Sequence, residues 1–406
     1  MANVSSSNGI EKYPKLRFPE FTEPWRDIKL SDVSSYRNKR TTVSKVKYVS
    51  TENMLQNYAG LEPYTEDIET DGIAIFCNDT LLANIRPYLK KVLKSEFNGA
   101  CSTDVLAFSP EQINPDFLYS LIAQDKFIDY VMSGAKGSKM PRGDKSHIMD
   151  YATSIPTEEE QQKISSFVEL INNRIAAQTY YIELLKKYKR GVSKRFFDEI
   201  HNDQNCEAKQ FSEVFELIQN NTFSRECLTD ENTDVLNVHY GDILVKYGSV
   251  LDPDIDTVPF IKSGTDLSKF SSSSYLQDGD VIFADTAEDY TVGKMCEIIN
   301  VSNRKILSGL HTMPFRPTIT FAPMYLGYYL NSAAFRTQIL PMIQGAKVSS
   351  ISKSEMKKTI IHIPSIERQT EIVSILNALD KRIKRTELIL AELKEMKKGL
   401  LQNLFI

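Results

Sequence analysis

Two long segments of the chain place apolar side chains at alternating steps of four and three residues. This two-in-seven pattern puts one narrow apolar stripe along an α-helix and is typical of a coiled coil. The sequence therefore predicts two long helices that pack through these stripes. The stripe residues are Ile164, Val168, Ile171, Ile175, Ile182, Leu185 and Val192 in the first segment and Ile372, Leu376, Leu379, Ile383, Leu390, Leu393 and Leu400 in the second.

The two segments are copies of each other. Residues 155–197 and 363–405 align without a gap at a constant offset of 208. Polar residues interrupt both stripes at matched positions, Gln178 with Thr386 and Lys189 with Lys397. Polar residues in such a stripe fix register and orientation, so we expect the copies to pair with each other. Each helix of about 42 residues would be roughly 60 Å long at 1.5 Å per residue.

Weaker matches extend the repeat over the rest of the chain. Residues 30–33 are echoed by residues 211–214, "DGIAIF" at 71–76 by "DGDVIF" at 278–283 (offset 207), and "GAKG" at 134 by "GAKV" at 345 (offset 211). Strand and turn patterns dominate each half, with one helix expected near residues 114–132 and another near 322–340. The sequence thus predicts two similar mixed α/β to α+β domains, joined by two long antiparallel coiled-coil helices.

The predicted boundaries follow from this repeat. The first domain covers residues 1–155 and begins with a flexible leader of about 24 residues, rich in proline and charge. The first long helix covers residues 156–200, the second domain residues 201–362, and the second long helix residues 363–406.

The composition indicates the cellular compartment in which the protein is expected. The five cysteines are odd in number and contain no CxxC pair, which favours a reducing compartment over a disulfide framework. No apolar run approaches membrane-spanning length, so we expect a cytoplasmic protein with no membrane contact. The net charge of −4 does not by itself favour a nucleic-acid partner.

Several segments resemble catalytic or metal-binding motifs but lack residues that those motifs require. The segment "NPDF" at 114–117 has Asp116 where the base-binding loop of amino-methyltransferases has proline. The glycine–lysine segment at 137–146 lacks the spacing of a phosphate loop, and the acidic run at 252–256 lacks the glycine and final glutamate of a calcium loop. The five histidines are scattered without metal-ligand spacing. We therefore expect no catalytic residue and no metal site in this chain.

Polar, glycine-containing loops in the two domains are better candidates for binding. Glycine lets a backbone approach a phosphate closely, and lysine and arginine add a salt-dependent attraction to nucleic acid. Residue type alone does not separate base contacts from phosphate contacts. The candidate DNA-contacting residues are Asn84, Arg86, Tyr88, Lys90, Lys136, Lys139, Arg142 and Lys145 in the first domain and Lys347, Ser349, Ser350 and Lys353 in the second.

With the duplication in view, the chain resembles the specificity (S) subunit of type I restriction–modification enzymes. The resemblance covers nearly the whole chain and is carried by "RFPEFTEPWRDIKLSDV" at the start, "IPTEEEQQKI" and "IPSIERQTEI" opening the two helices, and the domain–helix–domain–helix order. In the second helix opening, Ile366, Arg368 and Thr370 depart from the usual run of acidic residues and glutamine.

The resemblance implies a non-catalytic DNA-binding subunit. Each domain would be a target recognition domain for one half of a bipartite, asymmetric double-stranded DNA site, and the helices would set the spacer. Two methyltransferase subunits would dock on the chain, bind the cofactor S-adenosylmethionine and methylate adenine. Motor-nuclease (restriction) subunits would join for cleavage.

Two other functions stay open at this point. A coiled-coil adaptor could use its two globular domains to bind proteins, and only DNA binding would weaken steadily with salt. A self-contained methyltransferase is the third hypothesis, and it would require the isolated chain to bind S-adenosylmethionine.

Overall fold

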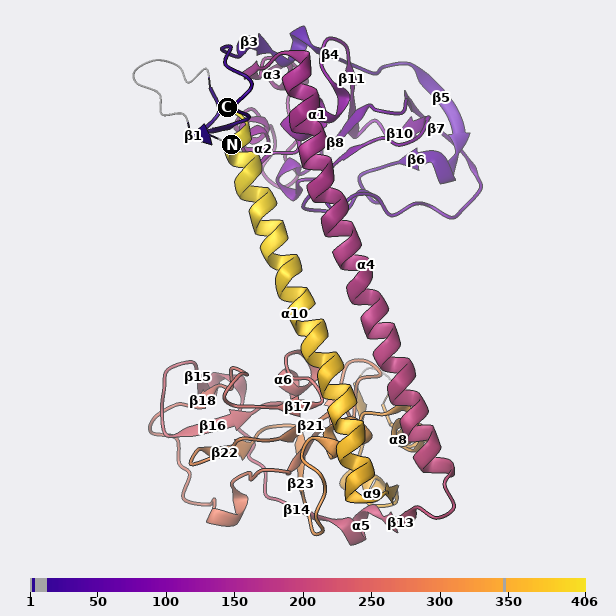
Figure 1. The fold of residues 1–406 in the computed structure, drawn as a ribbon, viewed down its shortest axis with the longest axis vertical. Coiled ribbons are helices and arrows are strands. Elements are labelled where there is room, and N and C mark those ends of the chain that lie inside the picture. The colour runs from indigo at the N-terminus through magenta and orange to yellow at the C-terminus, as the bar shows by residue number, and fades with distance from the viewer. Residues whose placement is uncertain (1, 4–12, 346–347) are drawn as a thin grey trace. The chain divides into compact units, whose positions relative to one another are not determined.

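The computed structural model describes residues 2–3, 13–345 and 348–406, which fold into two compact units. The first unit comprises Met1–Thr179 with Leu388–Ile406, and the second comprises Tyr180–Glu387. The two boundaries lie 387 − 179 = 208 residues apart, which is the offset of the sequence repeat. Each unit therefore contains one globular domain, one part of α4 (Glu158–Asn202) and one part of α10 (Ile366–Leu404) (Figure 1).

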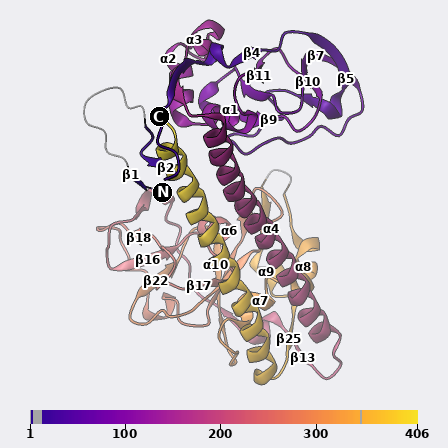
Figure 2. The same ribbon diagram turned by 45° about the horizontal axis from the view of Figure 1, so that its top comes forward.

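The two long helices pair in an antiparallel sense within the second unit. Lys186 contacts Glu387 at 2.6 Å, and Lys189 contacts Asp380 at 2.5 Å. Further along α4, Glu199 accepts from Arg368 at 2.9 Å. Residue numbers thus fall on α10 as they rise on α4. Figures 1 and 2 show the two helices side by side where they meet each domain.

The predicted stripe lies on the covered side of both helices. Every one of the predicted stripe residues is buried or half-buried. At the start of each helix the stripe also enters a domain core. Ile164 and Val168 belong to the core of the first domain together with Leu404 of α10, and Ile372 and Leu376 belong to the core of the second.

The first domain contains two four-stranded sheets and three short helices. The helices are α1 (Pro115–Ile122), α2 (Asp125–Ser133) and α3 (Lys145–Met149). One sheet has the order β5-β7-β10-β6, formed by Arg40–Ser44, Glu69–Ile75, Gly99–Cys101 and Tyr48–Val49. The other has the order β4-β11-β8-β9, formed by Ser34–Tyr36, Val105–Pro110, Thr80–Ala83 and Val92–Lys94. A separate pair joins β3 (Arg26–Lys29) to β12 (Ala152–Ile155), just before α4.

The second domain repeats this plan. Its larger sheet has the order β14-β23-β19-β21-β17, formed by Phe215–Leu217, Thr312–Pro317, Val281–Ala284, Met295–Ile298 and Val250–Leu251. Its smaller sheet has the order β15-β18-β16-β22, formed by Leu228–Thr229, Phe260–Ile261, Val235–Val238 and Lys305–Ser308. The pair β13 (Glu207–Gln210) and β25 (Ile360–Ile363) precedes α10 as β3 and β12 precede α4. The fold class predicted from the sequence is confirmed.

A buried glutamine in the first turn of each long helix ties the helix to its domain. Gln161 accepts a hydrogen bond from the Asn114 backbone N–H at 2.9 Å and donates to the Pro156 carbonyl at 3.0 Å. At the offset of 208, Gln369 accepts from the Ala322 N–H at 2.8 Å and donates to the Pro364 carbonyl at 2.9 Å. The identity of this glutamine in the two copies therefore has a structural cause.

The structure corrects two of the repeat alignments. By its place in the sheet, β19 corresponds to β8 and not to the "DGIAIF" strand β7, so the offset there is 201 and not 207. Asp79 and Asp280 precede these strands, and each accepts from a backbone N–H three residues earlier. In the hairpins that follow, Gly137 matches Gly345, both with positive φ, so that offset is 208 and not 211.

Two other predictions from the sequence are wrong in detail. The leader is folded in its described part, because Arg17 is buried and its guanidinium donates to Glu160 of α4 at 2.8 and 2.7 Å. The single helix expected at 114–132 is two helices, α1 and α2. The one expected at 322–340 is also two, α7 (Tyr325–Tyr329) and α8 (Ala333–Ile339), and the Ser332 hydroxyl accepts from the Phe335 N–H to start α8.

No helix in the described part of the chain is long and apolar enough to cross a membrane.

We predict that the buried glutamines are structural. Gln369→Ala leaves the buried Ala322 N–H without its acceptor and should lower the free energy of unfolding by about 1–3 kcal/mol in urea denaturation. Gln161→Ala should do the same through Asn114. The exposed neighbour Thr370→Ala is the control and should stay within about 0.5 kcal/mol of the parent chain. Equal effects of Gln369→Ala and Thr370→Ala would contradict this role.

Candidate nucleic-acid interface

A short hairpin at residues 136–142 joins α2 to α3 in the first domain. Lys136 and Arg142 exchange two backbone hydrogen bonds, both 2.9 Å long. Gly137 makes the turn with φ of +94°, a conformation that favours glycine. Lys139 and Met140 are exposed at the tip of the hairpin.

The loop that follows β8 lies against this hairpin. The Arg86 N–H donates to the Pro141 carbonyl at 2.8 Å, and Ile85 forms a β-bridge with Arg142. The two segments that the sequence nominated separately, 84–91 and 136–145, are therefore brought together.

The charged side chains of this surface fall into two groups. Arg86, Lys139 and Lys145 are exposed and have no ion-pair partner among the described residues. Lys136 pairs with Asp144 at 2.6 Å, and Lys90 pairs with Asp125 at 2.7 Å. Arg86, Lys139 and Lys145 are thus cations available to a phosphate. The Lys145 ammonium lies 5.9 Å from the centre of the Tyr36 ring. Of the other predicted residues here, Tyr88 is 48% exposed, and Arg142 pairs with Asp104.

Asn84 is the least exposed of the predicted DNA-contacting residues in this domain. The residue is only 7% exposed, and its side-chain oxygen is buried without a hydrogen-bond partner. Its backbone is held from both sides, since its N–H donates to the Asp104 carbonyl and its carbonyl accepts from the Gly143 N–H. The backbone of Asn84 supports the loop, and the DNA contact of its side chain stays a prediction.

Hydrogen bonds keep the carboxylates of this surface ionised. The Lys136 ammonium, the Ser146 hydroxyl and the His147 N–H together hold the pKa of Asp144 well below its usual range. Lys90 and the Tyr58 hydroxyl likewise lower the pKa of Asp125, although partial burial opposes them. Lys136 and Lys90 are therefore partly neutralised by carboxylates that do not titrate near neutral pH.

The second domain has a matching hairpin. Gln344 and Ser350 exchange backbone hydrogen bonds of 2.9 and 2.8 Å, and Gly345 turns with φ of +108°. Ser349 and Ser350 form the strand β24 and pair with β20 (Thr286–Ala287). Lys353 is half-buried at the start of α9 (Lys353–Met356). The predicted contact Lys347 lies outside the described residues.

Sequence reasoning missed the loop opposite this hairpin. Residues 285–294 occupy the position of the loop 84–91 and carry Tyr290, which is 84% exposed. The signal was present, because Ala83 and Ala284 end the matched strands β8 and β19 at offset 201. Because the sequence match was placed at offset 207, the loop after β19 was not aligned with the loop after β8. Unlike its counterpart, this loop is acidic at Glu288 and Asp289.

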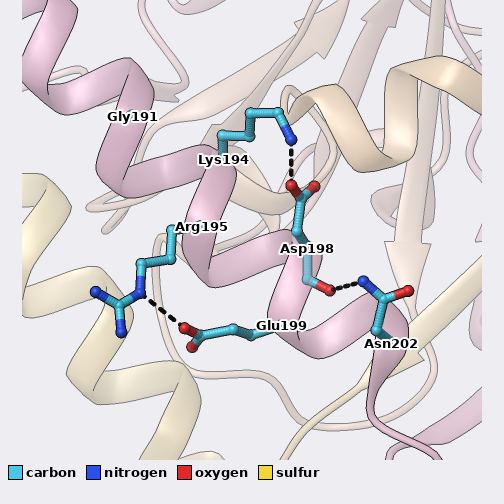
Figure 3. A pocket seen from close by; sticks show the side chains of 6 residues that line it. All are labelled: Gly191, Lys194, Arg195, Asp198, Glu199 and Asn202. Carbon is cyan, nitrogen blue, oxygen red and sulfur yellow. Dashed lines mark hydrogen bonds and ion pairs between the residues drawn. The ribbon is translucent and has the colours of Figure 1, made fainter.

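On the long helices of the second unit, some of the exposed charges are paired. Figure 3 shows a shallow pocket on α4 whose walls all come from that helix. There Lys194 pairs with Asp198, and Arg195 pairs with Glu199 at 2.8 Å. The charges in this pocket are paired, as are those of Lys186 and Lys189, which pair with α10. Lys187 and Arg190 of α4 are exposed and have no ion-pair partner among the described residues. In the parts of the chain that the structure describes, no group of three or more His, Cys, Asp or Glu side chains is arranged to hold a metal ion.

The family model described as "type I restriction modification DNA specificity domain" matches residues 22–186 and 204–395. The chain is 22% identical over 416 residues to the MjaVIII specificity subunit of Methanocaldococcus jannaschii, covering 93% of this chain and 91% of that protein. It is 21% identical over 174 residues to the EcoDI specificity subunit of Escherichia coli, covering 41% of this chain and 38% of that protein. An alignment to the MjaX specificity subunit of M. jannaschii also spans only 50% of that relative.

Solved structures share the fold. A chain from a structural study of complex assembly in a type I R-M system matches with a TM-score of 0.58 and 18% identity, over 93% of this chain and 96% of that one. The S subunit of a type I restriction–modification system from M. genitalium matches with a TM-score of 0.55 and 13% identity, over 97% and 99%.

The exposed and unpaired Arg86 and Lys139 give a prediction. Arg86→Ala and Lys139→Ala should each weaken binding to double-stranded DNA of any sequence. Each should also reduce the slope of log affinity against log salt by about one, because one phosphate contact is lost. Filter binding of the full chain over a salt series measures this. Lys187→Ala, on the exposed side of α4, should change neither quantity; an unchanged salt slope in both loop variants would contradict the assignment.

Proposed function

Since the chain belongs to the family of type I restriction–modification DNA specificity proteins, we propose that it binds a bipartite, asymmetric DNA site. The first domain binds one half of the site and the second domain binds the other. The chain itself carries no catalytic role, and a protein-binding adaptor is the less favoured function because the matched family model covers both domains.

One observation carries this proposal: the two domains share a backbone frame but not the side chains on it. The hairpins at 136–142 and 344–350 have the same hydrogen bonds and the same turn glycine, yet one carries Arg142 where the other carries Ser350. Two copies of one scaffold with different surface chemistry suit two different half-sites, because base edges are distinguished by the donors and acceptors that face them.

The long helices support a fixed spacing between the half-sites. Each helix is continuous over its full length, 45 residues in α4 and 39 in α10, and each belongs to both units. Continuous helices convert residue number into length at 1.5 Å per residue. The distance between the half-sites is then a property of the protein, as it is for other proteins that read two half-sites.

Partner subunits complete the activity. One of the similar solved chains comes from a study of complex assembly in a type I R-M system. By analogy, two methyltransferase subunits dock on this chain, bind S-adenosylmethionine and methylate adenine in the site that the chain selects. Motor-nuclease subunits join that complex for cleavage.

Lengthening both helices tests the spacing. One heptad inserted after Thr179 and one after Glu387 adds about 10 Å to each helix and keeps the stripe in register. Adenine methylation mapping in cells that express the chain with its methyltransferase subunits should find the same half-sites separated by about three more base pairs.

A matched control inserts a heptad into α4 alone, which breaks the pairing and should abolish modification. Altered half-sites at an unchanged spacing would contradict the proposed role of the helices.

A further inference from the structure

Each domain contains a corner with the same pattern of backbone hydrogen bonds, but the side chains at the two corners differ. In the first domain the Asn84 N–H donates to the Asp104 carbonyl at 2.8 Å, and in the second the Asp285 N–H donates to the His311 carbonyl at 3.1 Å. In both domains, the second half of the hairpin, at Arg142 or Ser350, pairs with the backbone next to this bond. We call this the recognition corner, and it consists of positions 84, 104 and 142 in the first domain and 285, 311 and 350 in the second.

The backbone hydrogen bonds between the hairpin and the corner are also matched in the two domains. The Gly143 N–H donates to the Asn84 carbonyl at 3.3 Å, and the Ile351 N–H donates to the Asp285 carbonyl at 2.9 Å. The bridge between Ile85 and Arg142 corresponds to the pairing of Thr286 with Ser350. A shared frame of this kind fixes where each side chain starts, so a change of residue changes the chemistry without moving the site.

In the first domain, a carboxylate forms an ion pair with an arginine. Arg142 Nη1 forms an ion pair with Asp104 Oδ1 at 2.8 Å, and the Arg142 side chain is 56% exposed. A guanidinium carries five N–H donors in a planar fork. The ion pair engages Nη1 of the fork, and the side chain as a whole stays more than half exposed.

In the second domain, a carboxylate and a threonine lie beside a histidine at the matched corner. The Thr286 hydroxyl donates to Asp285 Oδ1 at 2.8 Å and lies 3.4 Å from His311 Nδ1. His311 Nδ1 lies 3.3 Å from Asp285 Oδ1, and the imidazole packs edge-on to Tyr240 with ring centroids 5.3 Å apart. The His311 side chain is still 48% exposed. Its backbone has φ of +54°, in the left-handed region that most residues avoid, and strained positions of this kind gather at functional sites.

We infer that Arg142 and His311 are the base-reading residues of the two half-sites and that Asp104 and Asp285 are their positioning residues. This inference rests on the proposed function. The free N–H groups of Arg142 donate to the O6 and N7 acceptors of a guanine in the first half-site. His311 turns Nδ1 to Asp285 and presents Nε2 to a base edge in the second half-site.

Site selection from a randomised duplex library tests the inference with the full chain bound to its methyltransferase subunits. Arg142→Ala should relax one guanine position in the first half-site by roughly 5- to 150-fold and leave the second half-site unchanged. His311→Asn should relax one position in the second half-site only. Asparagine is chosen because it tolerates the left-handed backbone.

The positioning residues have their own readout. Asp104→Asn should relax the same base pair as Arg142→Ala, although Arg142 is still present, and a general loss of stability would not pick out that base pair. Arg142→Lys keeps a charge for Asp104 but lacks the planar fork, so it should weaken the guanine preference less than Arg142→Ala does while keeping the melting temperature of the parent chain. Arg304→Ala is the matched control, since Arg304 forms a similar exposed pair with Asp254 at 2.6 Å, and it should leave both half-sites unchanged.

The failures are distinguishable. If Arg142→Ala and Arg142→Lys weaken all sequences equally and keep the selected motif, the arginine contacts phosphate and the inference is wrong. If His311→Asn selects the parent motif, the histidine does not read a base. If the parent complex selects no two-part motif, the proposed function itself fails.

Discussion

A phenylalanine near the end of each long helix completes a domain core. In both cases it packs against aromatic residues of the domain that lie far from it in the sequence. Phe405 packs against Phe117 with ring centroids 5.0 Å apart, and Phe197 packs against Tyr325 and Tyr329 at 6.2 and 5.6 Å. Each unit therefore needs the first turns of one helix and the last turns of the other. Losing the last turns of either helix would therefore open a domain core.

This dependence explains which features the sequence could predict. The stripe and the offset of 208 identify the helices because packing demands the same apolar residues at both copies. Pro156, Gln161 and Phe197 are repeated at 364, 369 and 405, and in each copy the glutamine and the aromatic ring meet the domain in the same way. The family followed from these constrained segments, which lie at the contacts between helix and domain.

The candidate surface was only partly predictable, because its frame is made of backbone hydrogen bonds that leave no residue signature. Arg86 and Lys139 could be nominated by residue type, but the burial of Asn84 depends on its fold-specific bonds to Asp104 and Gly143. His311 had no sequence signal at all, since its partner Asp285 lies 26 residues away and its counterpart in the first domain is an aspartate. Insertions of different length in the two copies also misplaced the strand match by six residues.

Hydrogen exchange of Phe405→Ala tests the shared-core account most directly. Removing a buried phenylalanine costs about 3–5 kcal/mol, and here the loss should fall on the first unit alone. The account predicts faster amide exchange in β8, β11 and α1 and unchanged exchange in β19, β23 and α7. Unchanged protection in the first unit, or an equal loss in both units, would contradict it.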